Sequence, residues 1–323
     1  MPTMKDVAKH AGVSVGSVSN VINKRQVKQD TYEKVMASIK ELNYETNSIA
    51  KGLKTNRTYT IGLIIPTVWH PFFSEIAFRI EMTLKKYNYK LLLCDSTDNP
   101  ETEIEYISML RRNKIDGIIA ITYSDIDKYI ESELPFVSID RYFKQDVNFV
   151  SSDNFHGGML AAKVLVEKGS KKLLYIGSHN QFENATMDRR KGFEHYCKDN
   201  NIEYRVIDLL EPEQNYKEAL YNLLDSGYEV DGIFSINDFL GLDVIELMSQ
   251  YGKEVIKDYQ IIGFDGIKLS WERDYLISTI VQPIEEIAKQ AVKILFKAIE
   301  KNSSYVEQVI IPVKFAEGGT TIR

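Results

Sequence analysis

The sequence has little cysteine and no long apolar run. Two cysteines in 323 residues, Cys94 and Cys197, are too few for a disulfide scaffold or a cysteine-rich metal site, and they are typical of a reducing compartment. No apolar stretch approaches the ~20 residues that a membrane-spanning helix needs. Lys5, Asp6 and Lys9 stand where a secretory signal would have its apolar stretch. These absences predict a soluble protein of the cytoplasm with no membrane partner.

Motifs of catalysis and metal binding are also missing. There is no Gly-rich phosphate loop, no HExxH, no pair of closely spaced cysteines and no nucleophile elbow. The five histidines, at positions 10, 70, 156, 179 and 195, do not cluster in the sequence. A Ser-His-Asp set assembled from distant positions stays an alternative. We predict that the protein is not an enzyme and binds neither cofactor nor metal.

Charge is distributed unevenly along the chain. Residues 1–58 contain ten Lys and Arg against five Asp and Glu, a net of +5, whereas residues 59–323 contain 30 against 41, a net of −11. A basic head on an acidic body predicts that the head binds a polyanion and the body does not. On charge alone, chance variation of the surface explains the asymmetry equally well.

The head begins with two short helices joined by a tight turn. Thr3 and Asp6 have the spacing of a capping box for a helix over 4–11. Gly12 suits a left-handed C-cap, and Ser14 is a good N-cap for the next helix. This arrangement predicts a helix-turn-helix unit.

The second predicted helix, over 15–23, has an unusually small and polar outer face. Its apolar residues are Val18, Val21 and Ile22, and its opposite face is made of Gly16, Ser17, Ser19 and Asn20. A third helix is predicted over 31–42, starting at the Asp30-x-x-Glu33 pattern. A helix with such a face can enter the DNA major groove. A generic three-helix bundle with a hydrophilic surface is the alternative.

Residues 47–54, NSIAKGLK, form a separate short segment. Ile49, Ala50 and Leu53 share one side, and Lys51 and Lys54 are available for phosphates. Eight residues with an internal glycine are too few to hold a helix alone in water. The segment is predicted to fold only when something supports it. A minor-groove helix and a flexible tether with one exposed leucine are both consistent with these residues.

From residue 60 the pattern changes to alternating strands and helices. Apolar, β-branched runs predict strands over 60–65, 90–94, 116–121, 136–139, 172–177, 231–236 and 259–264. Helical patterns between them include 72–87, 100–113, 157–168 and 238–251. This alternation predicts parallel sheets covered by helices on both faces. More than 250 residues of the pattern predict two sheets rather than one.

In open α/β sheets, ligands bind beyond the carboxyl ends of the strands. The residues that follow the predicted strands, or lie near their ends, are candidates for effector binding: Trp69, Phe72, Phe73, Tyr123, Asp140, Arg141, Asp153, Arg189, Asn237 and Asp265. Carboxylates, amides, arginines and rings together suit a polyhydroxyl ligand. For each polar residue a turn or helix cap is the alternative, for Asp238 in particular, and Phe72 and Phe73 could belong to the core.

Nine segments, in order along nearly the whole chain, resemble the LacI/GalR family of bacterial transcription regulators. They are MKDVAKHAGVSVGSVSNVINK, VMASIKELNYETNSIAKGLKTNRTYTIGLIIP, HPFFSEI, KIDGII, SSDNFHGG, RRKGF, SINDFLGL, IIGFDG and VQP. The resemblance implies a DNA-binding head over 1–46, a hinge helix and linker over 47–58, and an effector-binding and dimerisation domain over 59–323. That last domain is expected to have two doubly wound parallel-sheet subdomains with a cleft between them, like periplasmic sugar-binding proteins.

The resemblance also implies which residues contact DNA. They are Thr3, Ser14, Val15, Gly16, Ser17, Asn20, Asn23, Ser48, Ala50, Lys51, Leu53 and Lys54. In the family, a leucine at the position of Leu53 wedges into a minor-groove base step. Val15 and Gly16 stand where larger polar groups are common, so the operator sequence does not carry over from other members.

In the body, the family places ligand-binding groups at Asp265, Arg189 and Asp153. Thr67, His70 and Leu210 depart from the common pattern, so the motifs do not specify the sugar. The IDR and SSDNFHGG segments are most similar to sucrose- or fructoside-responsive regulators.

Together these features predict a repressor of carbohydrate-utilisation genes, controlled by a sugar or sugar phosphate. A homodimer is expected on a two-fold operator. The sequence has no heptad segment, which favours a dimer over a coiled-coil tetramer. A sugar-binding transport protein and an α/β enzyme are the alternatives. The basic head and the lack of an export signal or catalytic motif disfavour both.

Overall fold

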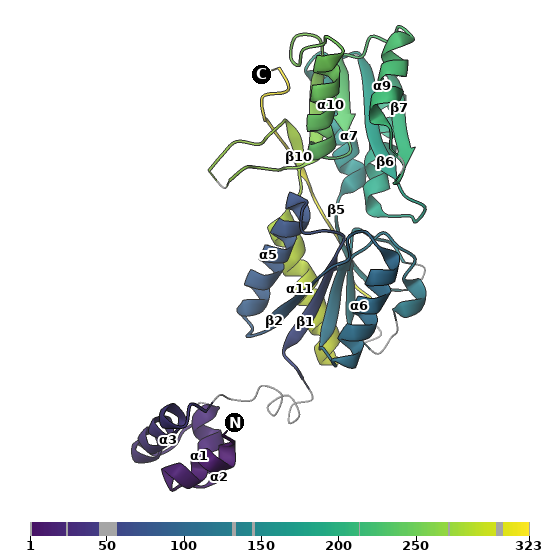
Figure 1. Ribbon diagram of the computed structural model, residues 1–323. Helices are drawn as coiled ribbons and strands as arrows, with labels where there is room; N and C mark the ends of the chain where they lie inside the picture. Colours follow the sequence, from purple (N-terminus) through teal and green to yellow (C-terminus); the bar gives the residue numbers. More distant parts are fainter. Residues whose placement is uncertain are drawn as a thin grey trace. The chain divides into compact units, whose positions relative to one another are not determined.

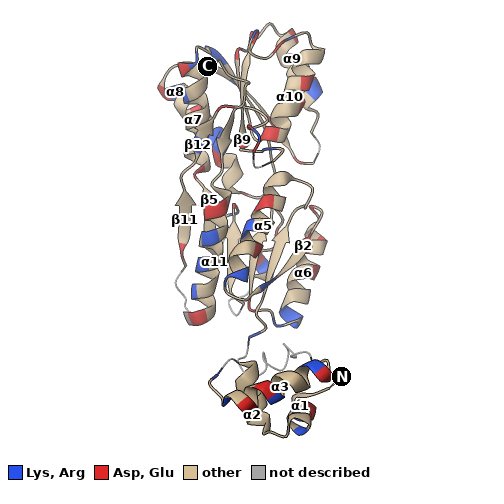
Figure 2. Ribbon diagram, turned by 90° about the vertical axis from the view of Figure 1, so that its left-hand side faces the viewer, with Lys and Arg blue, Asp and Glu red and all other residues tan. Residues whose placement is uncertain are grey.

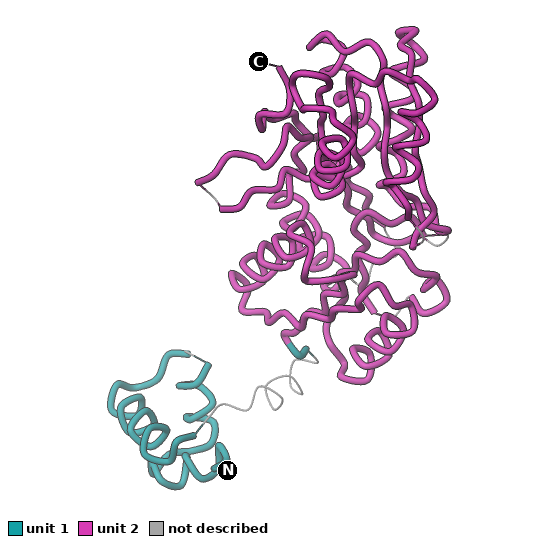
Figure 3. Tube along the Cα trace, turned by 45° about the horizontal axis from the view of Figure 1, so that its top comes forward, with its two compact units in different colours: residues 1–58 teal, residues 59–323 magenta. Residues whose placement is uncertain are grey.

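The computed structural model describes residues 2–23, 25–44, 57–130, 134–143, 146–212, 214–270, 272–301 and 306–322. The chain divides into two compact units, Met1–Thr58 and Tyr59–Arg323 (Figure 3). The predicted hinge segment over 47–54 lies outside the described residues. Among the described helices, none combines the length and apolar character needed to cross a membrane.

The described part of unit 1 contains three helices: α1 (Met4–Ala11), α2 (Val15–Ile22) and α3 (Gln29–Glu41). They pack around a small core of buried residues: Val7, Ala8, Val18, Val21, Val35 and Tyr44. The capping box is present, because Thr3 Oγ1 accepts from the Asp6 amide and the Asp6 carboxylate accepts from the Thr3 amide at 2.7 Å. Gly12 is left-handed, with φ of 66°, and Ser14 Oγ caps α2. These local predictions are confirmed.

The start of α3 differs from the prediction. The helix begins at Gln29, two residues before the predicted start, and its N-cap residue, Lys28, makes no side-chain cap hydrogen bond. Asp30 lies inside the first turn and accepts a hydrogen bond from Lys34 at 2.8 Å. The carboxylate therefore supports the helix through an i,i+4 pair instead of capping it.

Unit 2 contains two parallel sheets (Figure 1). The first has the order β11-β5-β4-β3-β1-β2, with β1 (Thr60–Ile65), β2 (Lys90–Asp95), β3 (Gly117–Ile121), β4 (Phe136–Ile139), β5 (Asn148–Ser152) and β11 (Gln308–Ile311). The second has the order β12-β10-β9-β8-β6-β7, with β6 (Lys172–His179), β7 (Glu203–Leu210), β8 (Gly232–Ser235), β9 (Gln260–Asp265), β10 (Thr279–Val281) and β12 (Lys314–Ala316). Neighbouring strands are parallel except for β10 and β12.

Helices cover the sheets through apolar faces. On the first sheet, α5 (Pro71–Lys85) and α11 (Ile284–Lys301) share one buried cluster, and α6 (Pro100–Arg112) packs into another. The second sheet is covered by α7 (Asn154–Glu167), α8 (Asp188–Asp199), α9 (Tyr216–Asp225) and α10 (Asp238–Gln250). The outer side of α11 carries residues of both charges (Figure 2), while Ile287, Ala288 and Leu295 are fully buried. The predicted fold class is thus confirmed.

Several features of the sheets were not predicted, among them the short strand β10. In the edge strand β7 every residue except Ile207 is exposed or half-buried, so the strand lacks the continuous apolar run of an interior strand. The segment EQVIIPVKF near the end of the sequence contributes to two strands: β11 in the first sheet and β12 in the second. Pro312, which has no amide to donate, lies between them.

Candidate functional site

A cleft of about 580 Å³ lies at the carboxyl ends of strands from both sheets. One wall comes from the first sheet and includes Phe72, Phe73, Glu103, Tyr123 and Asp140. The other comes from the second sheet and includes Asn184, Arg189, Glu211, Asn237 and Asp265. The cleft thus lies where strand-end binding is expected. Each sheet of unit 2 with its helices is called a lobe below, and residues of both lobes form the cleft.

Arg189 at the start of α8 lines the cleft and is held by several contacts. Its Nε donates to Asn154 Oδ1 at 2.7 Å, and its Nη1 donates to the Ile236 carbonyl at 2.6 Å. Nη1 also lies 3.6 Å from Asp265 Oδ1, and the guanidinium lies 3.7 Å from the centroid of the Phe264 ring. These contacts hold the guanidinium in one orientation inside the protein.

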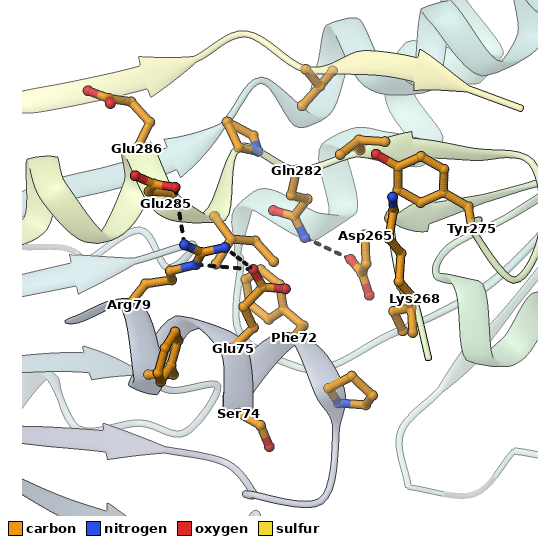
Figure 4. Close-up of a pocket in the computed structure, with 18 of the residues that line it drawn as sticks. Phe72, Ser74, Glu75, Arg79, Asp265, Lys268, Tyr275, Gln282, Glu285 and Glu286 are labelled. Carbon is orange, nitrogen blue, oxygen red and sulfur yellow. Dashed lines mark hydrogen bonds and ion pairs between the residues drawn. The ribbon is translucent and has the colours of Figure 1, made fainter. Parts of the chain in front are cut away.

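Asp265 at the end of β9 is the main partner of Arg189. Its backbone has φ of 115°, and Gln282 Nε2 donates to its Oδ1 at 2.7 Å (Figure 4). Burial raises the pKa of the Asp265 carboxyl, and the positive charge of Arg189 is the main influence that opposes this shift. Gln282 in turn accepts from Ser152 Oγ at 2.7 Å, so Asp265 is tied to segments that pass between the lobes.

A second buried carboxyl, Asp140 after β4, faces the same cleft. It accepts a hydrogen bond from Ser151 Oγ at 2.5 Å, and Asn154 Nδ2 donates to that hydroxyl at 3.0 Å. Burial raises the pKa of Asp140, while Ser151 and Arg189 favour its charged form. Asn154 therefore links the carboxyl of one lobe to the arginine of the other.

A third buried carboxyl, Glu103 in α6, was not among the predicted site residues. It accepts hydrogen bonds from Thr122 Oγ1 and, at 3.4 Å, from Ser96 Oγ. Burial raises the pKa of Glu103, and these hydroxyls act against the shift. Its only sequence signal is an acid in the first turn of a helix, which is also the common pattern of a solvated face.

The structure brings seven of the ten predicted effector residues into the cleft lining: Phe72, Phe73, Tyr123, Asp140, Arg189, Asn237 and Asp265. Trp69, Arg141 and Asp153 are not in the lining. Trp69 is 89% exposed. Arg141 is buried in an ion pair with Asp127, Nη2 to Oδ1 at 2.7 Å, and Asp153 Oδ1 caps α7 by accepting from the His156 amide.

Other lining residues could have been found from the same strand-end argument. The end of β6 and the segment after it contribute several, including Ser178, Asn180 and Phe182, and Gln282 stands in the VQP segment. Asp238 does not line the cleft. Its Oδ2 accepts from the amides of Gly266 and Ile267, so it holds the loop after Asp265.

In unit 1, the predicted DNA-contacting residues of the head fall into two exposure classes. Thr3, Ser14, Val15, Gly16 and Asn23 are exposed, and Ser17 and Asn20 are half-buried. The other five, Ser48, Ala50, Lys51, Leu53 and Lys54, lie outside the described residues. Val15 is 42% exposed although it is apolar, so the start of α2 presents an apolar side chain to solvent. No group of acidic, histidine or cysteine side chains able to hold a metal occurs in the described segments.

Comparison with known proteins decides the family. Residues 3–47 match the family model described as bacterial regulatory proteins, lacI family, and residues 58–318 match the periplasmic binding proteins and sugar binding domain of LacI family. This chain belongs to the LacI family. The resemblance found in the sequence is confirmed.

Individual LacI-family relatives match over nearly the whole chain. The sucrose operon repressor of Pediococcus pentosaceus is 34% identical over 323 residues, covering 99% of each chain. The ribose operon repressor of Halalkalibacterium halodurans is 32% identical, covering 99% of this chain and 97% of its own. A solved periplasmic binding protein/LacI transcriptional regulator from Alkaliphilus metalliredigens, complexed with D-xylulofuranose, is 32% identical with a TM-score of 0.71. The match covers 82% of this chain and 100% of that chain.

Proposed function

We propose that this LacI-family protein represses carbohydrate-utilisation genes and that a sugar or sugar phosphate in the cleft controls its affinity for operator DNA. The observation that carries the proposal is one chain with both a helix-turn-helix unit and a cleft built around Arg189 and Asp265. The names of the sucrose and ribose operon repressors support carbohydrate genes as targets. The protein would act in the cytoplasm, where its operator lies.

The DNA contacts are proposed to come from α2 and from the segment over 47–54. Ser14, Ser17 and Asn20 supply hydroxyl and amide groups, while Val15 and Gly16 allow close approach to the groove. Lys51, Lys54 and Leu53 would contact phosphates and a minor-groove base step.

The cleft offers the groups that a sugar requires. Arg189, Asp265, Asp140 and Asn237 can bind hydroxyls, and the rings of Phe72, Phe73 and Tyr123 can cover apolar faces of the ligand. The D-xylulofuranose bound to the Alkaliphilus protein supports a sugar as ligand.

A second pocket, of about 890 Å³, lies beside the cleft, and Phe72, Asp265 and Gln282 line both (Figure 4). Phe78 and Leu269 line it too and are 45% and 80% exposed. Exposed apolar residues at such a site are typical of an interface between proteins. We propose that a second copy of the chain covers this surface in a homodimer, which a two-fold operator would require. Phe78→Ser with Leu269→Ser should shift the sedimenting species from dimer toward monomer.

The DNA-binding proposal is tested by selecting duplexes from a random library with the full chain. Recovered sites should be two-fold symmetric, and binding by fluorescence anisotropy should weaken steeply as salt rises. Asn20→Ala should reduce affinity for the selected site about tenfold or more, because a side-chain contact to a base edge contributes ~1–3 kcal/mol. Ala37→Ser, at an exposed position of α3, is the control. Recovery of no common sequence would refute a specific regulator.

A further inference from the structure

The charges that line the cleft are mostly negative. Five carboxyl groups line it, against a single guanidinium and no lysine in the described lining: Asp98, Glu103, Asp140, Glu211 and Asp265, with Arg189 as the cation. Two histidines, His70 and His179, are also present. Burial lowers the pKa of His70, which favours its neutral form.

Arg189, the cation in the lining, already has partners within the protein. Arg189 Nε and Nη1 bond to Asn154 and the Ile236 carbonyl, and Asp265 lies beside Nη1. The Asp265 carboxylate offsets part of the guanidinium charge, which leaves less of it to neutralise a dianion. It can still offer a hydrogen bond to a neutral hydroxyl.

Helix N-termini are the usual alternative for binding phosphate. Three helices that begin at or next to the lining, α6, α9 and α10, each have the amide of their third residue bonded to an N-cap side chain, that of Asn99, Asn215 or Asn237. Each also carries an acidic residue in its first turn, so a phosphate there would meet carboxylates. Two more helices begin at the lining: α5, where the His70 ring accepts from the Phe72 amide at 3.3 Å, and α8, which carries Asp188 in its first turn.

The mouth of the cleft has a like-charged pair. Asp98 follows β2 in one lobe and Glu211 follows β7 in the other, and both line the cleft. The Asp98 pKa is raised by burial and by the carboxylates of Glu211 and Asp95. Further negative charge between these groups is unfavourable because like charges repel, and solvent weakens that repulsion since Asp98 and Glu211 are both exposed.

The rest of the polar lining is neutral. It consists of amides and hydroxyls that both donate and accept: Ser124, Ser178, Asn180, Gln181, Asn184, Thr186, Gln214, Asn237 and Gln282. Such groups satisfy a polyhydroxyl ligand without a charge on either partner.

From this lining we infer that the cleft selects an uncharged, unphosphorylated sugar and rejects its phosphate esters. The inference rests on the proposed function, since it specifies the ligand of the same site.

The test uses the full chain and matched pairs of probes: D-glucose with glucose 6-phosphate, D-fructose with fructose 6-phosphate, and D-ribose with ribose 5-phosphate. Each is titrated by calorimetry and thermal shift. For every pair in which either member binds, the free sugar should bind at least about tenfold more tightly than its ester, equivalent to ~1.4 kcal/mol. Inorganic phosphate should not compete with the sugar.

Charge-removing variants test the cause of the selectivity. Asp98→Asn is suitable because Asp98 has φ of 54° and asparagine tolerates that conformation. Combined with Glu211→Gln, it should reduce the preference for the free sugar severalfold. Glu101→Gln is the control. It removes one charge from the first turn of α6, close to Asp98 in the sequence, but Glu101 lies outside the lining, so the preference should stay unchanged.

The possible failures are distinguishable. An ester that binds as tightly as its free sugar, with binding lost in Arg189→Ala, overturns the selectivity and leaves the proposed site standing. A preference that the double variant does not reduce overturns the electrostatic cause. Binding of none of the six probes contradicts a sugar ligand, and the selectivity falls with the proposed function.

Discussion

Arg189 joins several elements around the cleft. The residue is 4% exposed, and it contacts the Ile236 carbonyl just after β8, a side-chain amide of α7 and a carboxylate of β9. Its neighbour Arg190 points elsewhere and pairs with Asp208 and Glu194 at 2.7 and 2.6 Å. Two adjacent arginines thus have different roles because successive positions of a helix face different directions.

Arg189→Ala should abolish the thermal stabilisation given by the bound sugar and leave DNA binding by the free protein largely intact. Loss of a charge-assisted hydrogen bond costs about 1.5–3 kcal/mol, which is tenfold or more in affinity. Arg190→Ala is the matched control and should keep sugar binding. Should Arg189→Ala fold poorly, Asp265→Asn removes the facing charge with less change in shape. Unchanged sugar affinity in both variants would place the ligand elsewhere.

Glu103 predicts a pH dependence of stability. Its pKa is raised above the ordinary 4.5 by burial, so the folded state holds its proton more tightly than the unfolded state does. The stability that this carboxyl contributes is therefore fully present below about pH 4.5 and is lost as pH rises through the folded pKa. Glu103→Gln should consequently have a higher Tm than the parent at neutral pH, with the difference shrinking as pH falls toward 4.5. Melting curves without sugar measure this, and a difference independent of pH would contradict it.

Among the elements, α7 and α8 lie unusually close together. A Cβ added at Gly158 would lie 1.9 Å from the Arg189 carbonyl oxygen, and one at Gly192 would lie 1.9 Å from the Phe155 carbonyl oxygen. The two helices therefore meet backbone to backbone. This contact positions the first turn of α8, which carries Arg189.

Gly192→Ala should destabilise unit 2 and weaken sugar binding at the same time. The added methyl group meets backbone and not a movable side chain, so the helices must separate, at a cost of about 1–3 kcal/mol. Urea unfolding and sugar titration are the measurements. Lys198→Ala, on the exposed side of the same helix, is the control. Loss of stability with unchanged sugar affinity would show that the contact does not position Arg189.

The segment over 47–54 yields a prediction from the sequence. If Leu53 inserts into a minor-groove base step, Leu53→Ala should weaken binding to the selected operator about tenfold or more, because bending the duplex then loses its compensating contact. Binding to unrelated duplexes should change far less, since it depends on phosphate contacts. Equal losses on both duplexes would argue against the wedge.

For the molecule as a whole, the cleft is joined to the connections between the lobes. The chain passes between the two sheets after β5, after β10 and between β11 and β12. Ser152, at the end of β5 where the first connection begins, donates to Gln282 on the second connection, and Gln282 donates to Asp265 in the cleft. A ligand held by Asp265 therefore acts on residues that set the arrangement of the lobes.

Control of DNA binding by the sugar must be reciprocal. If the sugar changes operator affinity by some factor, operator DNA must change sugar affinity by the same factor, typically about 5–150-fold. Sugar titrations with and without the selected duplex measure this factor. An inducer should bind more weakly to the DNA complex, and a co-repressor more tightly. Identical sugar affinity in both states would exclude allosteric control through the cleft.

The sequence by itself determined the local structure and the family. Thr3, Gly12 and Ser14 act on backbone groups within a few residues of themselves, so their roles follow from spacing alone. Interior strands were predictable for a similar reason, because a strand buried on both faces is apolar throughout. The strand-end rule then named most of the charged and aromatic candidates for the cleft.

Only the tertiary structure decided which of those candidates face the cleft. Trp69 and Phe72 are three positions apart, yet one is 89% exposed and the other is 5% exposed and lines the cleft. Thr122, distant in the sequence, donates a hydrogen bond to Glu103 in the cleft lining. The segment EQVIIPVKF belongs to two sheets because β11 pairs with β5 and β12 pairs with β10. These outcomes depend on contacts between segments far apart in the chain, such as Ser152 with Gln282. Local spacing carries no information about such contacts, because only the packed fold brings the partners together.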